Sequence, residues 1–100
     1  MRIISRKRIG QFCAVHPDAK EPLETWFRVA RKATWRNLTE VHQTYPHADL
    51  VGICTIFNIK GNHYRLITKI NYLKQTIYIR FILTHSEYDK GGWHNGCGCG

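Results

Sequence analysis

The sequence predicts an α+β fold in which two to three N-terminal helices pack on a small antiparallel sheet. Up to Tyr45, apolar residues recur with the spacing of an amphipathic helix, whereas from Val51 onward β-branched residues and alternation dominate. Short segments join the strand-like runs, which favours an antiparallel meander. Helices must then cover the apolar face of the sheet, and this gives a two-layer domain.

The helical part begins after a short predicted strand, Met1 to Ser5. One apolar stripe at i, i+3, i+4 and i+7 predicts the first helix, and it consists of Ile9, Phe12, Cys13 and His16. Pro17 ends this helix, because the residue before a proline disfavours the helical region. A second helix starts near Pro22. Asn37 and Glu40 resemble a capping box for a further helical stretch, Leu38 to Thr44.

The second half of the chain is expected to hold three strands, Val51 to Ile59, His63 to Tyr72 and Thr76 to Thr84. Turn signals at residues 60–62 and 73–75 separate them. In the last strand, alternation places four apolar residues on one face, and these are Ile77, Ile79, Phe81 and Leu83. Trp26 and Trp35 are interpreted as core anchors of the helical part.

The domain is expected to span residues 1–93, with the Gly-rich residues 94–100 as a flexible tail. Cys54 lies inside an apolar pattern, whereas Cys97 and Cys99 lie in the tail, so we predict unpaired cysteines and a reducing, cytoplasmic compartment. Cys-x-Cys lacks the ligand spacing of structural zinc sites, and we expect neither metal nor cofactor. No secretory signal and no membrane-spanning run is found in the sequence.

The charge balance is strongly basic. Fifteen Lys and Arg stand against seven Asp and Glu, a formal net charge of +8 over 100 residues. This excess favours a polyanionic partner such as RNA, DNA or an acidic protein surface. A generic basic surface without a nucleic-acid partner is the alternative.

Cationic and proton-transfer residues gather in the last two predicted strands. Arg65 and Lys69 share one face of a strand, and Arg80 lies on the neighbouring strand. His85 and Tyr88 follow the end of that strand. RNA is cleaved when its 2′-hydroxyl attacks the adjacent phosphate, a reaction for which histidine supplies acid or base and arginine binds the charged phosphate. The pattern therefore predicts a ribonuclease that needs no metal.

Several of these residues also have a purely structural interpretation. The basic face can be an ordinary solvated sheet surface, or the docking surface of a protein that meets an acidic partner. Asp89, next to Tyr88, is interpreted as a turn residue. Trp93 either stacks on RNA or closes the sheet edge. A non-catalytic basic RNA- or DNA-binding module remains the alternative to an enzyme.

Three stretches of sequence carry a family resemblance. They are FNI-x-GN-x-YRLI, YIR-x-ILTH-x-EYDKG-x-W and TWRNL-x-E-x(4)-YPHADLVG. From Met1 to Trp93, the chain resembles the HigB-type mRNA interferase toxins of the RelE superfamily. The resemblance implies a RelE-like fold and an endoribonuclease toxin that cleaves mRNA, either on the ribosome or free. It also implies a HigA-type helix-turn-helix antitoxin, which carries the complex to operator DNA.

The resemblance also implies roles for individual residues. Arg65 matches the arginine of a Tyr-Arg strand motif, His85 the histidine that closes the last strand, and Tyr88 a C-terminal aromatic residue. Arg80 is expected to complete the catalytic group, because Ser86 stands where the superfamily often has arginine. The residues expected to bind RNA around this centre are Lys60, His63, Lys69, Lys74, Lys90 and Trp93.

Overall fold

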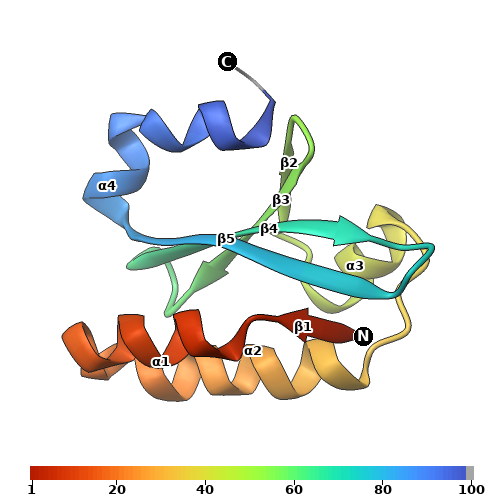
Figure 1. The fold of residues 1–100 in the computed structure, drawn as a ribbon, viewed down its shortest axis with the longest axis horizontal. Helices are drawn as coiled ribbons and strands as arrows, with labels where there is room; N and C mark the ends of the chain where they lie inside the picture. The colour runs from red at the N-terminus through yellow and green to blue at the C-terminus, as the bar shows by residue number, and fades with distance from the viewer. Residues whose placement is uncertain (99–100) are drawn as a thin grey trace.

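The computed structural model describes residues 1–98 and has helices on both sides of a five-stranded sheet (Figure 1). The helices of the first half are α1 (Arg6–Val15), the 3₁₀ turn η1 (Pro17–Ala19), α2 (Lys20–Lys32) and α3 (Leu38–Thr44). The strands are β1 (Arg2–Ile4), β2 (Asp49–Val51), β3 (Cys54–Ile59), β4 (Tyr64–Asn71) and β5 (Thr76–Thr84). The chain then continues into α4 (His85–Lys90) and the 3₁₀ helix η2 (Gly92–Cys97). The α+β class and the helical layer are confirmed.

The sheet has the order β1-β5-β4-β3-β2. Strands β2 to β5 form the expected antiparallel meander, while β1 adds to β5 in parallel and makes the sheet mixed. The single strand expected from Val51 to Ile59 is a hairpin of β2 and β3. Gly52 has a φ of 59° in its two-residue turn, a conformation that glycine adopts without steric cost.

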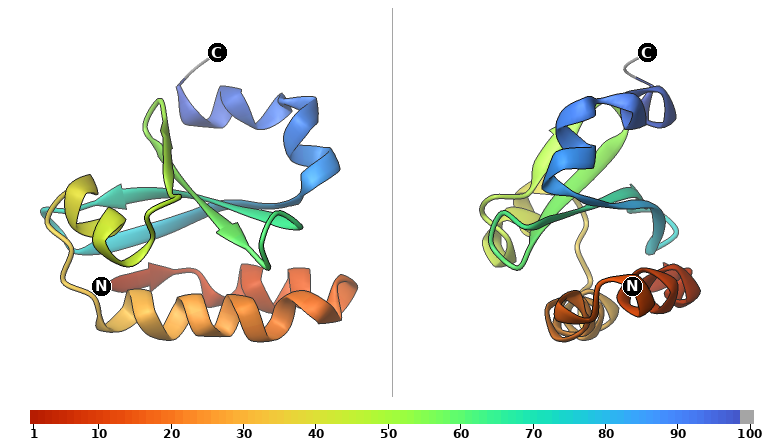
Figure 2. Two further views of the ribbon diagram at one scale, coloured as in Figure 1. Left: turned by 180° about the vertical axis from the view of Figure 1, so that it is seen from behind. Right: turned by 90° about the vertical axis from the view of Figure 1, so that its left-hand side faces the viewer.

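The first core lies between the sheet and the α1–α2 layer, whose helices run side by side below the sheet (Figure 2). Leu23, Trp26 and Ala30 form the buried face of α2. Trp26 packs edge-on against Phe57 of β3, with ring centroids 5.4 Å apart. Each fully buried large apolar side chain stabilises the fold by roughly 1.5–3 kcal/mol. Trp35 is also buried, so both predicted tryptophan anchors are confirmed.

A β-bulge in β5 reverses the alternation of this strand. Ile67 of β4 pairs with Phe81 and Thr68 pairs with Ile79, which leaves Arg80 as an extra residue between them. Ile77 and Ile79 face the first core, but Phe81 and Leu83 pack on the opposite side of the sheet. The prediction that these four residues share one face was therefore wrong.

That opposite side holds a second core under the C-terminal segment. Ile56 and Ile67 of the sheet pack there with Trp93 and Cys97 of η2. A disulfide joins Cys97 to Cys54 of β3, and both residues are fully buried. The expectation of unpaired cysteines was wrong for this pair, because η2 packs on the sheet and brings together residues 43 positions apart in the sequence. Residues 94–97 likewise belong to η2 rather than to a flexible tail, whereas Cys99 lies outside the described residues.

No helix within residues 1–98 is both long enough and apolar enough to cross a lipid bilayer. The longest, α2, has 13 residues and carries charged side chains along its outer face.

Candidate active site

Helix α4 fixes its side chains directly at the end of β5. Thr84 and Glu87 form a capping box: the Thr84 hydroxyl accepts from the Glu87 backbone N–H at 3.2 Å, and the Thr84 backbone N–H donates to the Glu87 carboxylate at 2.9 Å. This N–H holds the pKa of the Glu87 carboxyl below its usual value. Gly91, with a φ of 78°, ends the helix. The sequence thereby presents His85, Tyr88 and Asp89 at i, i+3 and i+4 on one helix face.

The centre of the site is His85, which lies between a cation and a carboxylate. Its Nε2 lies 3.1 Å from Oδ2 of Asp89, and its Nδ1 lies 3.5 Å from Nη2 of Arg65. A neutral imidazole with its hydrogen on Nε2 satisfies both contacts, because Nδ1 then accepts from the guanidinium. The side chains of His85 and Asp89 are 53% and 61% exposed, so both are accessible from the solvent.

Arg65 is held in place by the backbone of its own hairpin. Its Nη1 donates to the carbonyl oxygens of Asn62 at 3.1 Å and Tyr64 at 3.3 Å. The guanidinium carbon also lies 5.2 Å from the centroid of the Tyr88 ring, a cation–π contact. Arg65 of β4 thus lies close to His85 and Tyr88 of α4.

Tyr88 keeps its phenolic proton at neutral pH. Burial raises the pKa of its hydroxyl, and the carboxylates of Asp49 and Asp89 add to the increase, although Arg65 opposes it. The Tyr88 ring stacks on Trp93 with centroids 4.8 Å apart, and Nε1 of Trp93 donates to the Tyr88 carbonyl oxygen at 2.9 Å. Trp93 is only 5% exposed, which is the position of a packing residue that supports Tyr88.

A hollow of about 720 Å³ opens beside His85, and it includes Lys60, His63 and Ser86 in its lining. The backbone N–H of His85 donates to the His63 carbonyl oxygen at 3.0 Å, which ties the start of α4 to the β3–β4 turn. His63 Nδ1 lies 2.9 Å from the Lys60 carbonyl oxygen. Two residues expected to bind RNA, Lys60 and His63, therefore lie next to His85.

Asp18 of η1 anchors this turn from the helical layer. Its carboxylate accepts from the Tyr64 hydroxyl at 2.7 and 2.8 Å and forms an ion pair with Lys60 Nζ at 2.8 Å. The hydrogen bonds from Lys60 and Tyr64 lower the pKa of the Asp18 carboxyl to about 2. Asp18 thus connects η1 to the segment that carries Lys60 and His63.

Replacing Asp18 with asparagine is expected to destabilise the protein in a pH-dependent way. The lowered pKa means that ionised Asp18 stabilises the folded state fully above roughly pH 5, and that this contribution fades as the pH falls towards 2. Urea unfolding of wild type and Asp18→Asn should therefore differ at neutral pH and converge near pH 2, with exposed Glu21→Gln as the control. A difference that is constant over this range would contradict the assigned contacts.

Other residues predicted for the site lie elsewhere. Nη2 of Arg80 donates to the Gly96 carbonyl oxygen at 3.0 Å, and no hydrogen bond or ion pair among residues 1–98 joins Arg80 to Arg65 or His85. Lys69 lies with Arg80 in a separate hollow in the middle of the sheet. Lys74 lies in the exposed turn between β4 and β5, and Lys90 is exposed at the end of α4.

Asp89 is the residue that sequence reasoning missed. We interpreted it as a turn residue, but it lies within α4 and contacts His85 through its carboxylate. The available signal was the i, i+4 spacing of His85 and Asp89, which places both side chains on one face once the segment is helical.

Comparison with known proteins identifies the family. Residues 19–91 match the HigB toxin family model, described as the RelE-like toxic component of a toxin-antitoxin system. The chain belongs to this HigB toxin family. It is 25% identical over 93 residues to the mRNA interferase HigB of Escherichia coli O6:H1, with 90% of each chain covered. It is also 25% identical over 92 residues to the mRNA interferase toxin HigB of Escherichia coli K12, with 89% of this chain and 88% of the relative covered.

Family membership makes this chain the toxin of a toxin–antitoxin system and an endoribonuclease, and it implies a cognate antitoxin. The matched region contains Arg65, His85 and Asp89 but ends before Trp93. In this HigB toxin, the clustered residues of β4 and α4 thus lie within the part that defines the family.

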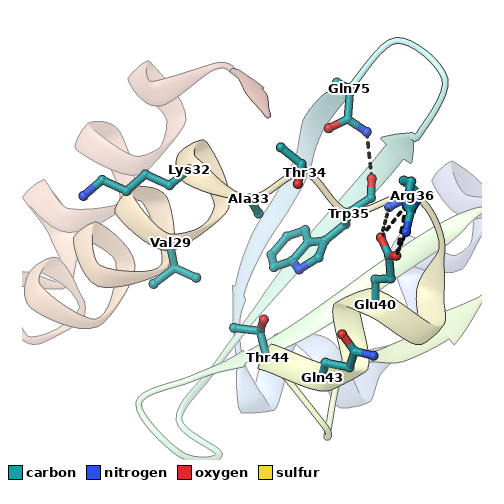
Figure 3. Close-up of a pocket in the computed structure, with 10 residues that line it drawn as sticks. All are labelled: Val29, Lys32, Ala33, Thr34, Trp35, Arg36, Glu40, Gln43, Thr44 and Gln75. Carbon is teal, nitrogen blue, oxygen red and sulfur yellow. Dashed lines mark hydrogen bonds and ion pairs between the residues drawn. The ribbon is translucent and has the colours of Figure 1, made fainter.

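A hollow of about 950 Å³, larger than the one beside His85, lies away from the cluster, where the end of α2 faces α3 (Figure 3). Its polar groups are largely paired with one another: Arg36 forms an ion pair with Glu40 at 2.9 Å, and Gln75 Nε2 donates to the Trp35 carbonyl oxygen at 2.7 Å. These contacts tie the segment before α3 to the β4–β5 turn and to α3, and they are structural. Size alone therefore does not mark the site.

Proposed function

We propose that this HigB toxin cleaves mRNA by attack of a 2′-hydroxyl on the adjacent phosphate, with His85 at the reacting centre. The observation that carries the proposal is the position of His85 between Arg65 and Asp89, at the edge of an open hollow. Histidine accepts and donates protons near neutral pH, and a guanidinium stabilises the negative charge that develops on phosphorus.

The proposed reaction is an intramolecular transfer of the phosphoryl group from O5′ to O2′. His85 takes the proton of the 2′-hydroxyl, the bond from O2′ to phosphorus forms, and the bond from phosphorus to O5′ breaks. The leaving 5′-oxygen takes a proton from water and the His85 imidazolium returns its proton to the solvent, which gives a 2′,3′-cyclic phosphate and a 5′-hydroxyl end. Arg65 neutralises the phosphate, Asp89 orients the imidazole, and Tyr88 contributes a protonated hydroxyl beside the guanidinium. No metal or cofactor takes part in these steps.

We propose the partners that follow from this reaction. The substrate is mRNA, reached on the ribosome or free, and the net charge of +8 favours association with both. A HigA-type helix-turn-helix antitoxin neutralises the toxin and brings the complex to operator DNA. The toxin acts in the cytoplasm, where translated mRNA is present.

The test is cleavage by the purified toxin of a 5′-labelled mRNA fragment in the presence of a metal chelator. The expected result is a set of discrete products that end in a cyclic phosphate, seen again as new 5′ ends by primer extension after induction in cells. Intact transcripts, together with salt-sensitive RNA binding, would instead support the non-catalytic binding module.

A further inference from the structure

A second basic hollow lies on the sheet, separate from the His85 cluster. It has a volume of about 820 Å³ and is found where the start of α1 meets the middle of β4 and β5. The residues that matter for its chemistry are Arg8, Lys69, Asn71, Tyr78 and Arg80. We call it the distal groove.

Local structure explains why these side chains meet. Lys69 of β4 pairs directly with Tyr78 of β5, so the two side chains lie on the same face of the sheet. Arg80 is the extra residue of the β-bulge, and such residues have their side chains redirected relative to a regular strand. Arg8 belongs to the first turns of α1, which follow directly from β1 at the sheet edge.

The distal groove gathers positive charge without a compensating acid. No carboxylate lines it, and within residues 1–98 no ion pair involves Arg8, Lys69 or Arg80. These three cations line one hollow, so an anion bound there would interact favourably with each of them. This distinguishes the groove from the Arg36–Glu40 region, where the charges are paired.

Backbone carbonyl groups hold two of these cations in fixed positions. Nη1 of Arg8 donates to the Arg80 carbonyl oxygen at 3.0 Å, and Nη2 of Arg80 donates to the Gly96 carbonyl oxygen at 3.0 Å. A guanidinium has five N–H donors, so each arginine keeps donors for a ligand. Pre-positioned side chains lose little conformational entropy on binding.

We propose that the distal groove binds the phosphates of the RNA strand whose scissile linkage lies at Arg65 and His85. This inference rests on the proposed function and extends it. Arg65 and Lys69 are on the same face of β4, four residues and therefore roughly 13 Å apart along the strand. Ile67 lies between them on this face and is covered by Trp93 and Cys97, so an RNA strand that contacts both cations passes around η2. Arg80 is then an RNA-positioning residue rather than a catalytic one.

The chemistry of the groove favours RNA over an acidic protein. Two guanidinium groups offer forked donors that match phosphate oxygens, and the Tyr78 ring beside them provides a surface on which a base can stack. Asn71 adds an amide that can contact sugar or base. An acidic segment of a protein partner would form ion pairs with the cations, but its carboxylates would not stack on the Tyr78 ring.

The test measures RNA affinity in full-length toxin carrying His85→Ala, so that the RNA is not cleaved. The probe is a single-stranded RNA of about 12 nucleotides, titrated at several salt concentrations. Arg8→Gln and Lys69→Gln should each weaken binding about 3- to 10-fold and reduce the slope of log K against log salt by about 0.7. Lys7→Gln, one residue from Arg8 and exposed on α1, is the control for net charge and should leave both quantities unchanged.

The outcomes separate this inference from the proposed function. If wild type cleaves RNA but the groove variants bind RNA as tightly as Lys7→Gln does, the inference that the distal groove binds RNA is wrong and the proposed function stands. If wild type does not cleave RNA but its RNA affinity still depends on Arg8 and Lys69, the proposed function is wrong and RNA binding by the distal groove is supported. If Arg8→Gln and Lys69→Gln lose more affinity for a polyglutamate of equal charge than for RNA, the assignment of the groove to RNA is overturned.

Discussion

Replacing His85 with alanine is expected to lower the rate of RNA cleavage by about 10²- to 10⁴-fold, the usual contribution of a general acid or base. The physical reason is the position of the imidazole between Arg65 and Asp89, where it is both exposed and oriented. The fold should persist, because His85 is exposed and the capping box of α4 is formed by Thr84 and Glu87. The measurement is single-turnover cleavage of labelled RNA, with circular dichroism to verify the fold.

Two matched variants make this expectation specific. His47→Ala removes an exposed histidine from the loop before β2 and should cleave RNA at the wild-type rate. Asp89→Asn keeps the size of the side chain but removes its charge, so it should reduce the rate less than His85→Ala does. Equal cleavage rates in wild type and His85→Ala would show that the reacting centre lies elsewhere.

Loss of the Cys54–Cys97 disulfide is expected to lower the free energy of unfolding by about 2–4 kcal/mol. The link closes a long loop, since the cysteines are 43 positions apart in the sequence, and it holds η2 against β3. Without it, the unfolded chain has more freedom, and Trp93 is less firmly held against Tyr88. Urea unfolding of wild type with and without a thiol reductant, and of Cys54→Ala, measures the difference.

The control is Cys13→Ala, which removes a free cysteine on α1 and should respond to the reductant as wild type does. Cys54→Ala should be insensitive to reductant. Identical unfolding of wild type under reducing and non-reducing conditions would show that the pair contributes no stability as a disulfide. Disulfides are rare in the cytosol, so the same measurement bears on the compartment in which the toxin acts.

The parts of the fold that sequence reasoning predicted are those governed by local rules. The apolar spacing of Leu23, Trp26 and Ala30 predicted the buried face of α2, and Asn37 caps α3 by accepting from the Glu40 backbone N–H at 3.0 Å. Short connections were sufficient to predict the meander. In each case the determining interactions are between residues close together in the sequence.

The features that sequence reasoning missed depend on pairing between distant segments. The bulge at Arg80 is defined by the register of β5 against β4, and strict alternation gives no sign of an extra residue. The Cys54–Cys97 pair requires η2 to lie on the outer face of the sheet. At the site, alternation predicted a single group of cations, but the register separates Arg80 from Arg65.

The bulge at Arg80 also has a consequence for how related sequences should be compared. Removing Arg80 would give continuous alternation in which Ile79 and Ile82 still face the helical layer and Phe81 still faces away, because Arg80 is the extra residue. Position 80 is therefore the place in β5 where a related sequence can lack a residue without turning the other side chains of the strand to the opposite face. An alignment of HigB toxins that allows no gap in β5 would match inward residues to outward ones on one side of the bulge, so the two halves of the strand are best aligned separately.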